Sequence, residues 1–330
     1  MTPIVDMVPP AGLDIFLETH GWGGAAVSAV AGDASFRRYF RVATSDGKKA
    51  ILMDAPPPHE DPKPFIDIAE YLLDAGFRAP AIWAKDLSRG LVLLEDFGDR
   101  RMREHLDEHP EDETAIYQRA IDTIVRMSTA PCADLAPYDE AAYLREVRLL
   151  TEWYMPAMGL PVDQAAFDGV WTDALAPVAN CQSVTVLRDY HAENVMLLDD
   201  GEQGIIDFQD ALIGHPAYDL VSLLQDARRG VSPELEATML EYYQQQANAG
   251  PDFGLHYALL GAQRNTKIIG IFTRLWKRDG KDRYLEFLPR MWGLLERDLE
   301  HPGLASLKSW FDANIPSHIR ALSPETVSAA

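Results

Sequence analysis

The order of hydrophobic and polar positions predicts a small sheet in the first hundred residues of this 330-residue chain. A helical pattern near residues 13–20 comes first, and a proline-rich loop at 56–64 leads into a second helical pattern at 65–76, which ends at Gly76. Short apolar runs bounded by polar turns predict strands at residues 25–32, 36–43, 50–55, 81–87 and 90–96. Together these elements predict a compact β lobe with one helix packed on it.

After about Asp99 the hydrophobic spacing becomes mainly helical, for example over residues 111–130 and 140–154. Residues 183–208 are the exception, because three short apolar runs separated by polar turns predict a hairpin-like insert between helices. We therefore expect an α+β protein with two lobes and a ligand in the cleft. The expected parts are a β lobe, a hinge and a larger, mainly helical lobe, at residues 1–95, 96–99 and 100–330.

The charge of the chain argues against several classes of partner. Fifty-one acidic and thirty basic residues give a net charge of −21, which repels nucleic-acid backbones and anionic membrane surfaces. Cys132 and Cys181 are far apart and lack a metal-binding spacing, so we expect free, buried thiols. The chain shows no signal-peptide pattern and no apolar run near the roughly 18 residues of a spanning helix. These features predict a cytoplasmic protein and leave its oligomeric state open.

Three side chains of the insert are the strongest candidates for a catalytic site. Asp189 is followed five residues later by Asn194, and Asp207 lies eighteen residues after Asp189. Phosphoryl transfer needs a carboxylate beside the attacking hydroxyl and oxygen ligands for Mg²⁺ at the phosphates. The spacing is similar to the protein-kinase pattern H-R-D-x-x-x-x-N followed by D-F-G, with Leu187 in place of the histidine and Gln209 in place of the glycine. The alternative is a hairpin whose turn carboxylates are merely solvated.

A second Asp-Phe-Gly tripeptide, Asp96-Phe97-Gly98, precedes the Asp/Asn loop and has no predicted metal role. It directly follows the last strand of the β lobe, where a kinase-type fold has its hinge. We therefore expect the backbones of Glu95 and Phe97 to contact the adenine of ATP.

Longer segments around these residues resemble the aminoglycoside/choline phosphotransferase family, which comprises small-molecule kinases with a bilobal protein-kinase-like fold. The segments GDASFRRYFRV, MDAPPP, LRDYHAENVM, IIDFQDALIGHPAYDLVSLLQDAR and QRNTKIIGIF span residues 32–272. They are similar to bacterial anomeric kinases for N-acetylmuramate and N-acetylglucosamine in cell-wall recycling. The resemblance implies that Asp189 is the base, that Asn194 and Asp207 bind Mg²⁺, and that Asp219 is structural. It also implies ATP-dependent transfer to the anomeric hydroxyl of an amino sugar, which gives the sugar 1-phosphate.

Two departures from the family pattern concern the nucleotide phosphates. Related folds carry a lysine on the third strand, paired with a helix glutamate, whereas this chain has Met53 there and Glu70 as the expected helix residue. The turn that covers the phosphates has one glycine, Gly32, in place of a glycine-rich loop. The candidates to contact the phosphates are Ser35, Arg37, Arg38, Lys48 and Lys49. For the arginines, a solvated strand face is the alternative interpretation.

A basic segment in the helical lobe indicates an acceptor site. Residues 261–283 carry seven basic and two acidic side chains, a net +5 within a protein of −21. On a helix, four of the basic residues share one face: Arg264, Lys267, Arg274 and Arg278. This charge suits an anionic acceptor, such as the lactyl carboxylate of N-acetylmuramate, with Arg264, Asn265 and Lys267 as expected contacts. A solvated face that balances acidic neighbours is the alternative.

Polar residues beside the catalytic loop supply the other expected sugar contacts, His191, Glu193 and Asp210. His191 either contacts a sugar hydroxyl or orients the loop, and the two carboxylates either accept hydrogen bonds from the sugar or are simply exposed. Two other functions stay open. One is phosphotransfer to another small alcohol, of the aminoglycoside or choline type. The other is an ATP-binding regulatory module without catalysis.

Overall fold

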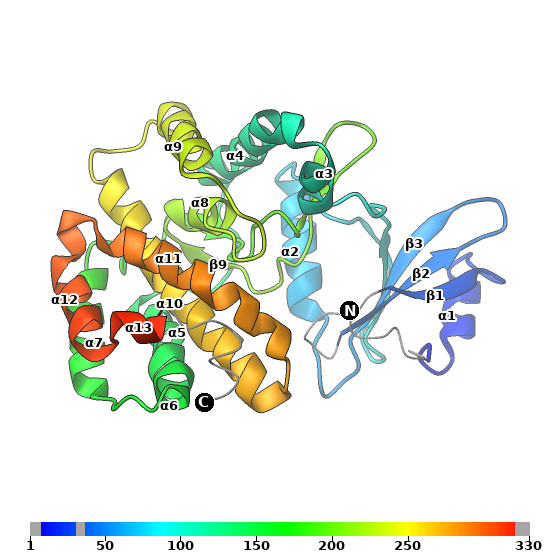
Figure 1. Cartoon of the computed structure of the whole chain (residues 1–330). Coiled ribbons are helices and arrows are strands. Elements are labelled where there is room, and N and C mark those ends of the chain that lie inside the picture. The colour runs from blue at the N-terminus through cyan, green and yellow to red at the C-terminus, as the bar shows by residue number, and fades with distance from the viewer. Residues whose placement is uncertain (1–7, 31–36, 321–330) are drawn as a thin grey trace. The chain divides into compact units, whose positions relative to one another are not determined.

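A computed structural model describes residues 8–30 and 37–320 of the chain, which form two compact units (Figure 1). The first unit comprises Met1–Glu108 with Glu193–Asp210, and the second comprises His109–Ala192 with Ala211–Ala330. The chain therefore passes between the units three times. One half of the predicted catalytic insert belongs to the unit that contains the sheet, and the other half belongs to the helical unit.

The first unit is built on a five-stranded antiparallel sheet with the order β1-β2-β3-β5-β4. Its strands are β1 (Ala26–Val30), β2 (Arg38–Ala43), β3 (Lys49–Asp54), β4 (Ile82–Asp86) and β5 (Leu91–Glu95). Alternate residues such as Phe40, Val42 and Leu52 are fully buried in a core shared with the short helix α1 (Leu13–Thr19). The helix and the five strands expected from the hydrophobic pattern are confirmed.

The helix α2 (Lys63–Asp74) confirms the helical spacing predicted after the proline-rich loop. A proline stands in its first turn, where the missing N–H has no partner to lose. The helix ends before Gly76, which has a φ of 82°, and the N–H of Phe77 donates to the carbonyl of Leu72 at 2.8 Å. The ring of Phe65 on the buried face of α2 stacks on Phe208, with ring centroids 4.9 Å apart.

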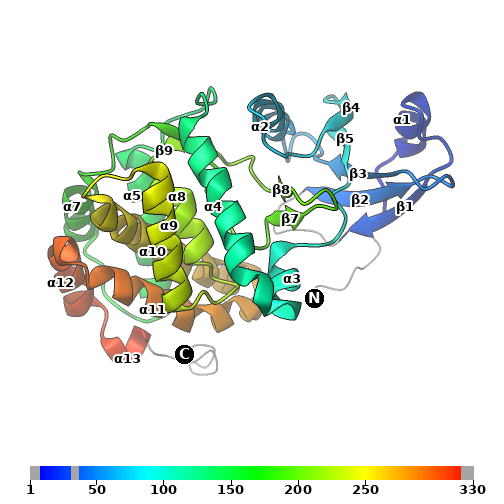
Figure 2. The ribbon, with the colours of Figure 1, turned by 90° about the horizontal axis from the view of Figure 1, so that it is seen from above.

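A two-stranded hairpin completes the first unit, made of β7 (Val195–Leu197) and β8 (Gln203–Ile205). It lies beside the helix α3 (Met102–Glu108), as Figure 2 shows, and Arg101 forms an isolated bridge with Met196. On the other side, the N–H of Ile205 donates to the carbonyl of Arg78 at 2.7 Å. The hairpin is therefore attached to the first unit through both of its strands.

The expected hairpin-like insert is only partly correct. Its first apolar run forms β6 (Val184–Val186), which pairs with β9 (Leu212–Gly214) in the second unit and not with β7. β9 was missed because a strand of three residues has no measurable alternation of polar and apolar positions. Consecutive short apolar runs also do not reveal which of them pair.

Helices make up most of the second unit, in agreement with the predicted helical lobe. Its helices are α4 (Glu113–Thr129), α5 (Glu140–Leu149), α6 (Met155–Ala157), α7 (Gln164–Leu175), α8 (Ala217–Leu224), α9 (Pro233–Ala247), α10 (Phe253–Asp279), α11 (Leu288–Leu299), α12 (Ala305–Asn314) and α13 (Ser317–Arg320). Short 3-10 turns are η1 (Pro110–Asp112), η3 (Asp282–Phe287) and η4 (Pro302–Leu304), and η2 (Leu150–Tyr154) is a π-helical turn that continues α5.

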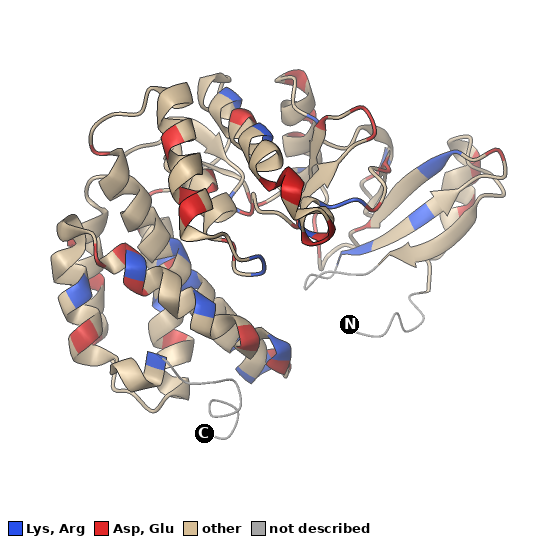
Figure 3. Cartoon of the chain, turned by 45° about the horizontal axis from the view of Figure 1, so that its top comes forward, with Lys and Arg blue, Asp and Glu red and all other residues tan. Residues whose placement is uncertain are grey.

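The long helix α10 forms the centre of this unit and packs against α5, α8 and α11 (Figure 1). A side chain at Gly270 would collide with the backbone of Leu149, so this glycine permits the close approach of α10 and the end of α5. Acidic and basic residues are distributed along many of the helices (Figure 3). Most of α10 is buried, however, and its middle turns carry charged side chains inside the unit.

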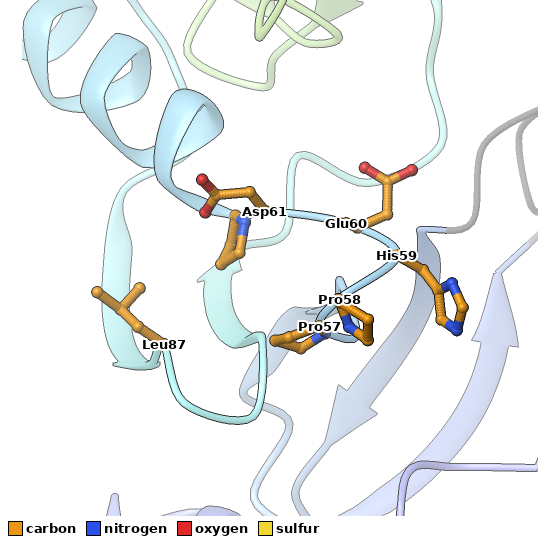
Figure 4. Close-up of a pocket in the computed structure, with 7 residues that line it drawn as sticks. Pro57, Pro58, His59, Glu60, Asp61 and Leu87 are labelled. Carbon is orange, nitrogen blue, oxygen red and sulfur yellow. The ribbon is translucent and has the colours of Figure 1, made fainter.

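A surface pocket in the first unit lies at the proline-rich loop, lined by Pro57, Pro58, His59, Glu60, Asp61, Pro62 and Leu87 (Figure 4). Its polar side chains point in different directions and do not converge on one point (Figure 4). None of the predicted site residues lines this pocket.

The two cysteines are free, as expected, but the expectation that both are buried is wrong. Cys132 is exposed and Cys181 is half-buried, and both sulfur atoms lie within 3.6 Å of an oxygen atom of Ser183. Within residues 8–30 and 37–320, no helix combines the length and the apolar composition needed to cross a membrane.

His215 is buried just before α8 and is held as a neutral imidazole. Its Nδ1 accepts the backbone N–H of Ala217 at 3.1 Å, so its Nε2 carries the proton and lies 3.1 Å from Nδ1 of His256. Burial, reinforced by the neighbouring His256, lowers the pKa of His215 to about 4.

The stability of the protein is therefore expected to fall as the pH drops from about 6.5 towards 4, because the unfolded chain binds a proton that the folded chain excludes. At pH 5 this difference amounts to about 2 kcal/mol in the free energy of unfolding. Urea unfolding at pH 7 and pH 5 measures it. Between pH 7 and pH 5, the free energy of unfolding should fall by about 2 kcal/mol less in His215→Gln than in the wild type. His318→Gln is the control, because His318 is exposed, and it should behave like the wild type. Equal losses in all three proteins would contradict the assignment.

Candidate active site

The hairpin of the first unit brings Asn194 and Asp207 together. Asn194 precedes β7 and Asp207 follows β8, and the pairing continues beyond the strands because Ile206 donates its N–H to the carbonyl of Asn194 at 3.1 Å. The amide of Asn194 donates to one carboxylate oxygen of Asp207 at 3.3 Å. The amide of Gln209 donates to the other oxygen at 2.9 Å. Two residues thirteen positions apart in the sequence thus lie side by side.

This pair suits a magnesium ion. Asp207 offers a carboxylate and Asn194, which is 8% exposed, offers an amide oxygen. Mg²⁺ is commonly bound through one or two protein ligands and completes its shell with water and substrate phosphates. In the described part of the chain no three His, Cys, Asp or Glu side chains cluster around a metal site, so a metal here would depend on phosphate oxygens. Gln209, which stands at the position of the kinase glycine, holds the carboxylate of Asp207, the candidate metal ligand.

The loop that carries Asp189 belongs to the second unit and is fixed by α8. Asp219 on α8 is 5% exposed, and its two carboxylate oxygens accept the backbone N–H groups of Leu187 at 2.7 Å and Arg188 at 2.8 Å. Ser222 donates to the carbonyl of Arg188 at 3.1 Å. These contacts hold Arg188 at a φ of 71°, a backbone conformation that a non-glycine residue keeps only when its surroundings enforce it. The structural role implied for Asp219 is thus visible in its contacts.

The charge of Asp189 is favoured by its surroundings. Burial raises the pKa of this carboxyl, but Lys267, His191 and Arg264 outweigh burial and hold the pKa below its usual range. Asp189 is therefore negatively charged at neutral pH. A charged carboxylate in a fixed loop is able to accept a hydrogen bond from a substrate hydroxyl and later its proton.

Glu146 on α5 organises the positive charges near this loop, and the sequence analysis missed it. It forms ion pairs with Arg188 and, at 3.1 Å, with Lys267, and it accepts hydrogen bonds from Tyr138 and Gln263. Burial raises the pKa of Glu146, but Lys267 and Arg188 reverse the effect and lower it. No linear pattern marks Glu146, because its partners come from three other segments of the chain.

The three expected acceptor contacts on α10 differ in their surroundings. Asn265 is fully buried, and its amide donates to Gln225 at 2.7 Å and to Asp298 at 2.9 Å, which gives it a structural role. Lys267 is buried and paired with Glu146. Arg264 is also buried, so the alternative of a solvated basic face is wrong for this part of the helix. Only the C-terminal turns of α10 carry exposed basic side chains, those of Lys277 and Arg278.

The other expected sugar contacts have partners within their own units. His191 is buried, its backbone N–H donates to the carbonyl of Asp189 at 3.1 Å, and its Nε2 accepts from Arg228 at 3.3 Å, which favours the loop-orienting role. Glu193 forms an ion pair with Arg103 at the start of α3 in the first unit. Asp210 is exposed.

On the third strand of the sheet, Met53 is completely buried, so an uncharged side chain occupies the position at which related folds carry a lysine. Glu70, its expected counterpart on α2, pairs instead with Lys85 of β4 at 2.8 Å. Both groups of this pair are largely exposed. The lysine–glutamate pair implied by related folds is thus absent at this position.

The basic residues near the turn expected to cover the phosphates differ in whether they form ion pairs and in how far they are buried. Arg38 pairs with Asp54 across β2 and β3, while Arg37 is half-buried just before β2. Lys48 and Lys49 are exposed. Ser35 and Gly32 lie outside the residues that the structure describes.

The segment expected to be the hinge keeps backbone groups available at Phe97. No hydrogen bond within the described residues involves its N–H or carbonyl, whereas the N–H of Glu95 donates to the carbonyl of Ala81 at 2.9 Å. The Phe97 ring packs closely over Gly204 of β8, where a side chain would leave only 2.6 Å to the ring. Asp96 forms an ion pair with Arg41 at 2.7 Å, so it has a structural partner.

Comparison with known proteins shows which family the chain belongs to. Residues 26–256 match the phosphotransferase enzyme family. The chain belongs to this family. N-acetylmuramate/N-acetylglucosamine kinase from Caulobacter vibrioides is 35% identical, over 92% of this chain and 96% of the relative. The protein of that name from Pseudomonas aeruginosa is 36% identical, over 87% of this chain and 89% of the relative.

Two solved structures of small-molecule kinases confirm the kinase-like fold. The choline kinase LicA from Streptococcus pneumoniae matches with a TM-score of 0.62 at 15% identity, over 88% of this chain and 98% of that one. The ADP-bound aminoglycoside phosphotransferase APH(2'')-Ib matches with a TM-score of 0.60 at 13% identity, over 86% and 97%. The prediction of an ATP-dependent phosphotransferase is confirmed, and with it the predicted family and fold class.

Proposed function

We propose that the chain transfers the γ-phosphoryl group of ATP to the anomeric hydroxyl of N-acetylmuramate and of N-acetylglucosamine, in the cytoplasm, as a step of cell-wall recycling. The observation that carries this proposal is the 35–36% identity to two kinases named for these sugars, over 87–92% of the chain. The charged, fixed carboxylate of Asp189 supports it, because a group of this kind is what an alcohol acceptor requires.

In this proposal Asp189 orients the anomeric hydroxyl and receives its proton. The sugar oxygen forms a bond to the γ-phosphorus while the bond from that phosphorus to the ADP oxygen breaks, so the products are the sugar 1-phosphate and ADP. An anomeric hydroxyl is more acidic than an ordinary alcohol, which lowers the demand on a carboxylate base. Asp219 keeps the base in place by holding two backbone N–H groups of its loop.

Asn194 and Asp207 are the residues that would hold Mg²⁺, which when bound neutralises charge on the nucleotide phosphates. Asn194 follows Asp189 by five residues, so the length of the chain alone keeps their Cα atoms within about 18 Å. We assign the adenine to the backbone N–H and carbonyl of Phe97, which form no hydrogen bond with the described residues, and the contact of Glu95 would come from its carbonyl. Ser35, Arg37 and Arg38 remain the proposed phosphate contacts.

Basic side chains around Asp189 favour a neutral or anionic acceptor over a cationic one. Arg188, Lys267 and Arg264 all act on the Asp189 carboxyl. A cationic acceptor such as choline or an aminoglycoside would be repelled by these groups. A regulatory module without catalysis has no need of a carboxylate that three cations and a fixed loop keep charged.

An acceptor screen tests the proposal. We expect Mg²⁺-dependent release of ADP from ATP with N-acetylmuramate and N-acetylglucosamine, and none above background with choline or kanamycin. Turnover with choline or kanamycin but with neither sugar would overturn the proposed acceptor. ATP binding without turnover on any of the four acceptors would favour the regulatory module.

A further inference from the structure

The guanidinium of Arg264 is buried without a partner in the middle of α10. The residue is 4% exposed, and its Nη1 is enclosed without a hydrogen-bond partner among the described residues. No ion pair or hydrogen bond of its side chain to any other described residue is formed. Other buried arginines of this unit differ, since Arg229 pairs with Glu113 at 2.6 Å and Arg320 pairs with Asp312 at 3.0 Å.

A buried cation without a partner lowers the stability of the folded protein, so its presence requires an explanation. Charged groups that leave water are normally compensated by an opposite charge or by several hydrogen bonds. The carboxylates packed around this part of α10 are already engaged. Asp219 holds the catalytic loop, Glu146 holds Arg188 and Lys267, and Asp298 accepts from Gln225 and Asn265. The charge of Arg264 acts on the carboxylates of Asp189 and Asp219, but among the described residues neither forms an ion pair or hydrogen bond with it. The hydrogen-bond donors of Arg264 are therefore left for an anion from outside the chain.

The position of Arg264 places that anion on the acceptor side of the reaction. Arg264 lies in the same unit as Asp189, whereas Asn194 and Asp207, the candidate metal ligands, lie in the other unit. The positive charge of Arg264 acts on both Asp189 and Asp219, which indicates that it is close to the loop of the base. Of the three α10 residues expected at the acceptor, Asn265 and Lys267 are held by internal partners.

We propose that Arg264 binds the lactyl carboxylate of N-acetylmuramate and thereby sets the preference between the two sugars. This inference rests on the proposed function, because it assumes that both sugars are acceptors. The two sugars differ in the lactyl ether at C3, which gives N-acetylmuramate a negative charge that N-acetylglucosamine lacks. A guanidinium binds a carboxylate through two parallel hydrogen bonds, and such charge-assisted bonds are strong when they are shielded from water. Arg264 is therefore a specificity-determining residue, because N-acetylglucosamine has no carboxylate for it to bind.

The substitution Arg264→Gln tests this assignment with both sugars in parallel. We expect kcat/KM for N-acetylmuramate to fall about 100-fold, as expected for the loss of charge-assisted hydrogen bonds. For N-acetylglucosamine we expect a loss of about tenfold or less, because Arg264 also helps to keep Asp189 charged but has no carboxylate to bind on this sugar. Arg278→Gln is the matched control, because it removes the same charge from an exposed position on the same helix, and it should alter neither value.

A neutral analogue separates binding of the carboxylate from a structural role of Arg264. In the wild type, the lactyl amide of N-acetylmuramate should be about 100-fold poorer than the acid, and in Arg264→Gln the acid and the amide should be equal. The wild-type comparison holds even if the variant fails to fold. If Arg264→Gln lowers kcat/KM equally for both sugars, or if the wild type uses the acid and the amide equally well, the assignment of Arg264 is overturned and the proposed function is not affected. A wild type that phosphorylates neither sugar would refute the proposed function, and with it this ligand for Arg264.

Discussion

Replacing Asp189 with asparagine is expected to lower kcat by about 1,000-fold, while KM for ATP and for the sugar changes by less than about threefold. Asparagine keeps the size of the side chain but cannot accept the proton of the attacking hydroxyl. The backbone contacts of the loop come from Asp219 and Ser222 and do not involve the altered carboxylate, so the loop keeps its conformation. Initial rates with saturating ATP and Mg²⁺, together with calorimetric titration of the sugar, measure both quantities.

The matched control for this prediction is Asp200→Asn. Asp200 is exposed at the tip of the β7–β8 turn and accepts the N–H of Glu202 at 2.9 Å, which asparagine also does. The control should retain wild-type kcat. If Asp189→Asn binds the sugar normally and keeps near-normal turnover, Asp189 is not the base.

The second large effect is expected from Asp207→Asn. This change removes the negative charge from the pair that would hold Mg²⁺ and leaves two neutral amides side by side. We expect kcat to fall by about 1,000-fold and the Mg²⁺ concentration for half-maximal activity to rise at least about tenfold. A titration of activity with Mg²⁺ at constant ATP measures both effects.

Asp199→Asn serves as the control for the metal site, because Asp199 is exposed on the same hairpin and has only a distant ion pair with Arg100, at 3.5 Å. Its Mg²⁺ dependence should match that of the wild type. An unchanged Mg²⁺ dependence in Asp207→Asn, with activity lost, would show that Asp207 acts on something other than the metal.

Individual helices and strands such as α2 were predictable because the signals that specify each of them lie within one short segment of sequence. The helix α2 has five buried apolar residues at helical spacing and stops before a glycine with positive φ, and both signals are local. The pairing of β6 with β9 was not predictable, because it joins two three-residue strands that are separated by the β7–β8 hairpin. Likewise, the return of residues 193–210 to the first unit depends on contacts with α3 and Arg78.

The candidate site likewise contains some residues that a sequence pattern identifies and others that only the structure identifies. Asp189, Asn194 and Asp207 stand out because their spacing is a linear pattern, and the side-by-side position of the last two follows from one hairpin. Glu146 does not stand out, because its role depends on Arg188 and Lys267, which lie 42 and 121 positions further along the chain. For Arg264, the sequence indicates a basic helix face, but only the structure shows which of its charges has no internal partner.

The central claim is that the phosphoryl group arrives on the anomeric oxygen of an amino sugar, and phosphorus NMR of the product tests it most directly. The wild-type protein is incubated with ATP, Mg²⁺ and N-acetylmuramate, and the product is examined by proton–phosphorus correlation. We predict one new phosphomonoester resonance, split into a doublet by the anomeric proton and correlated with it. A resonance correlated with any other sugar proton, or inorganic phosphate as the only product besides ADP, would contradict the account.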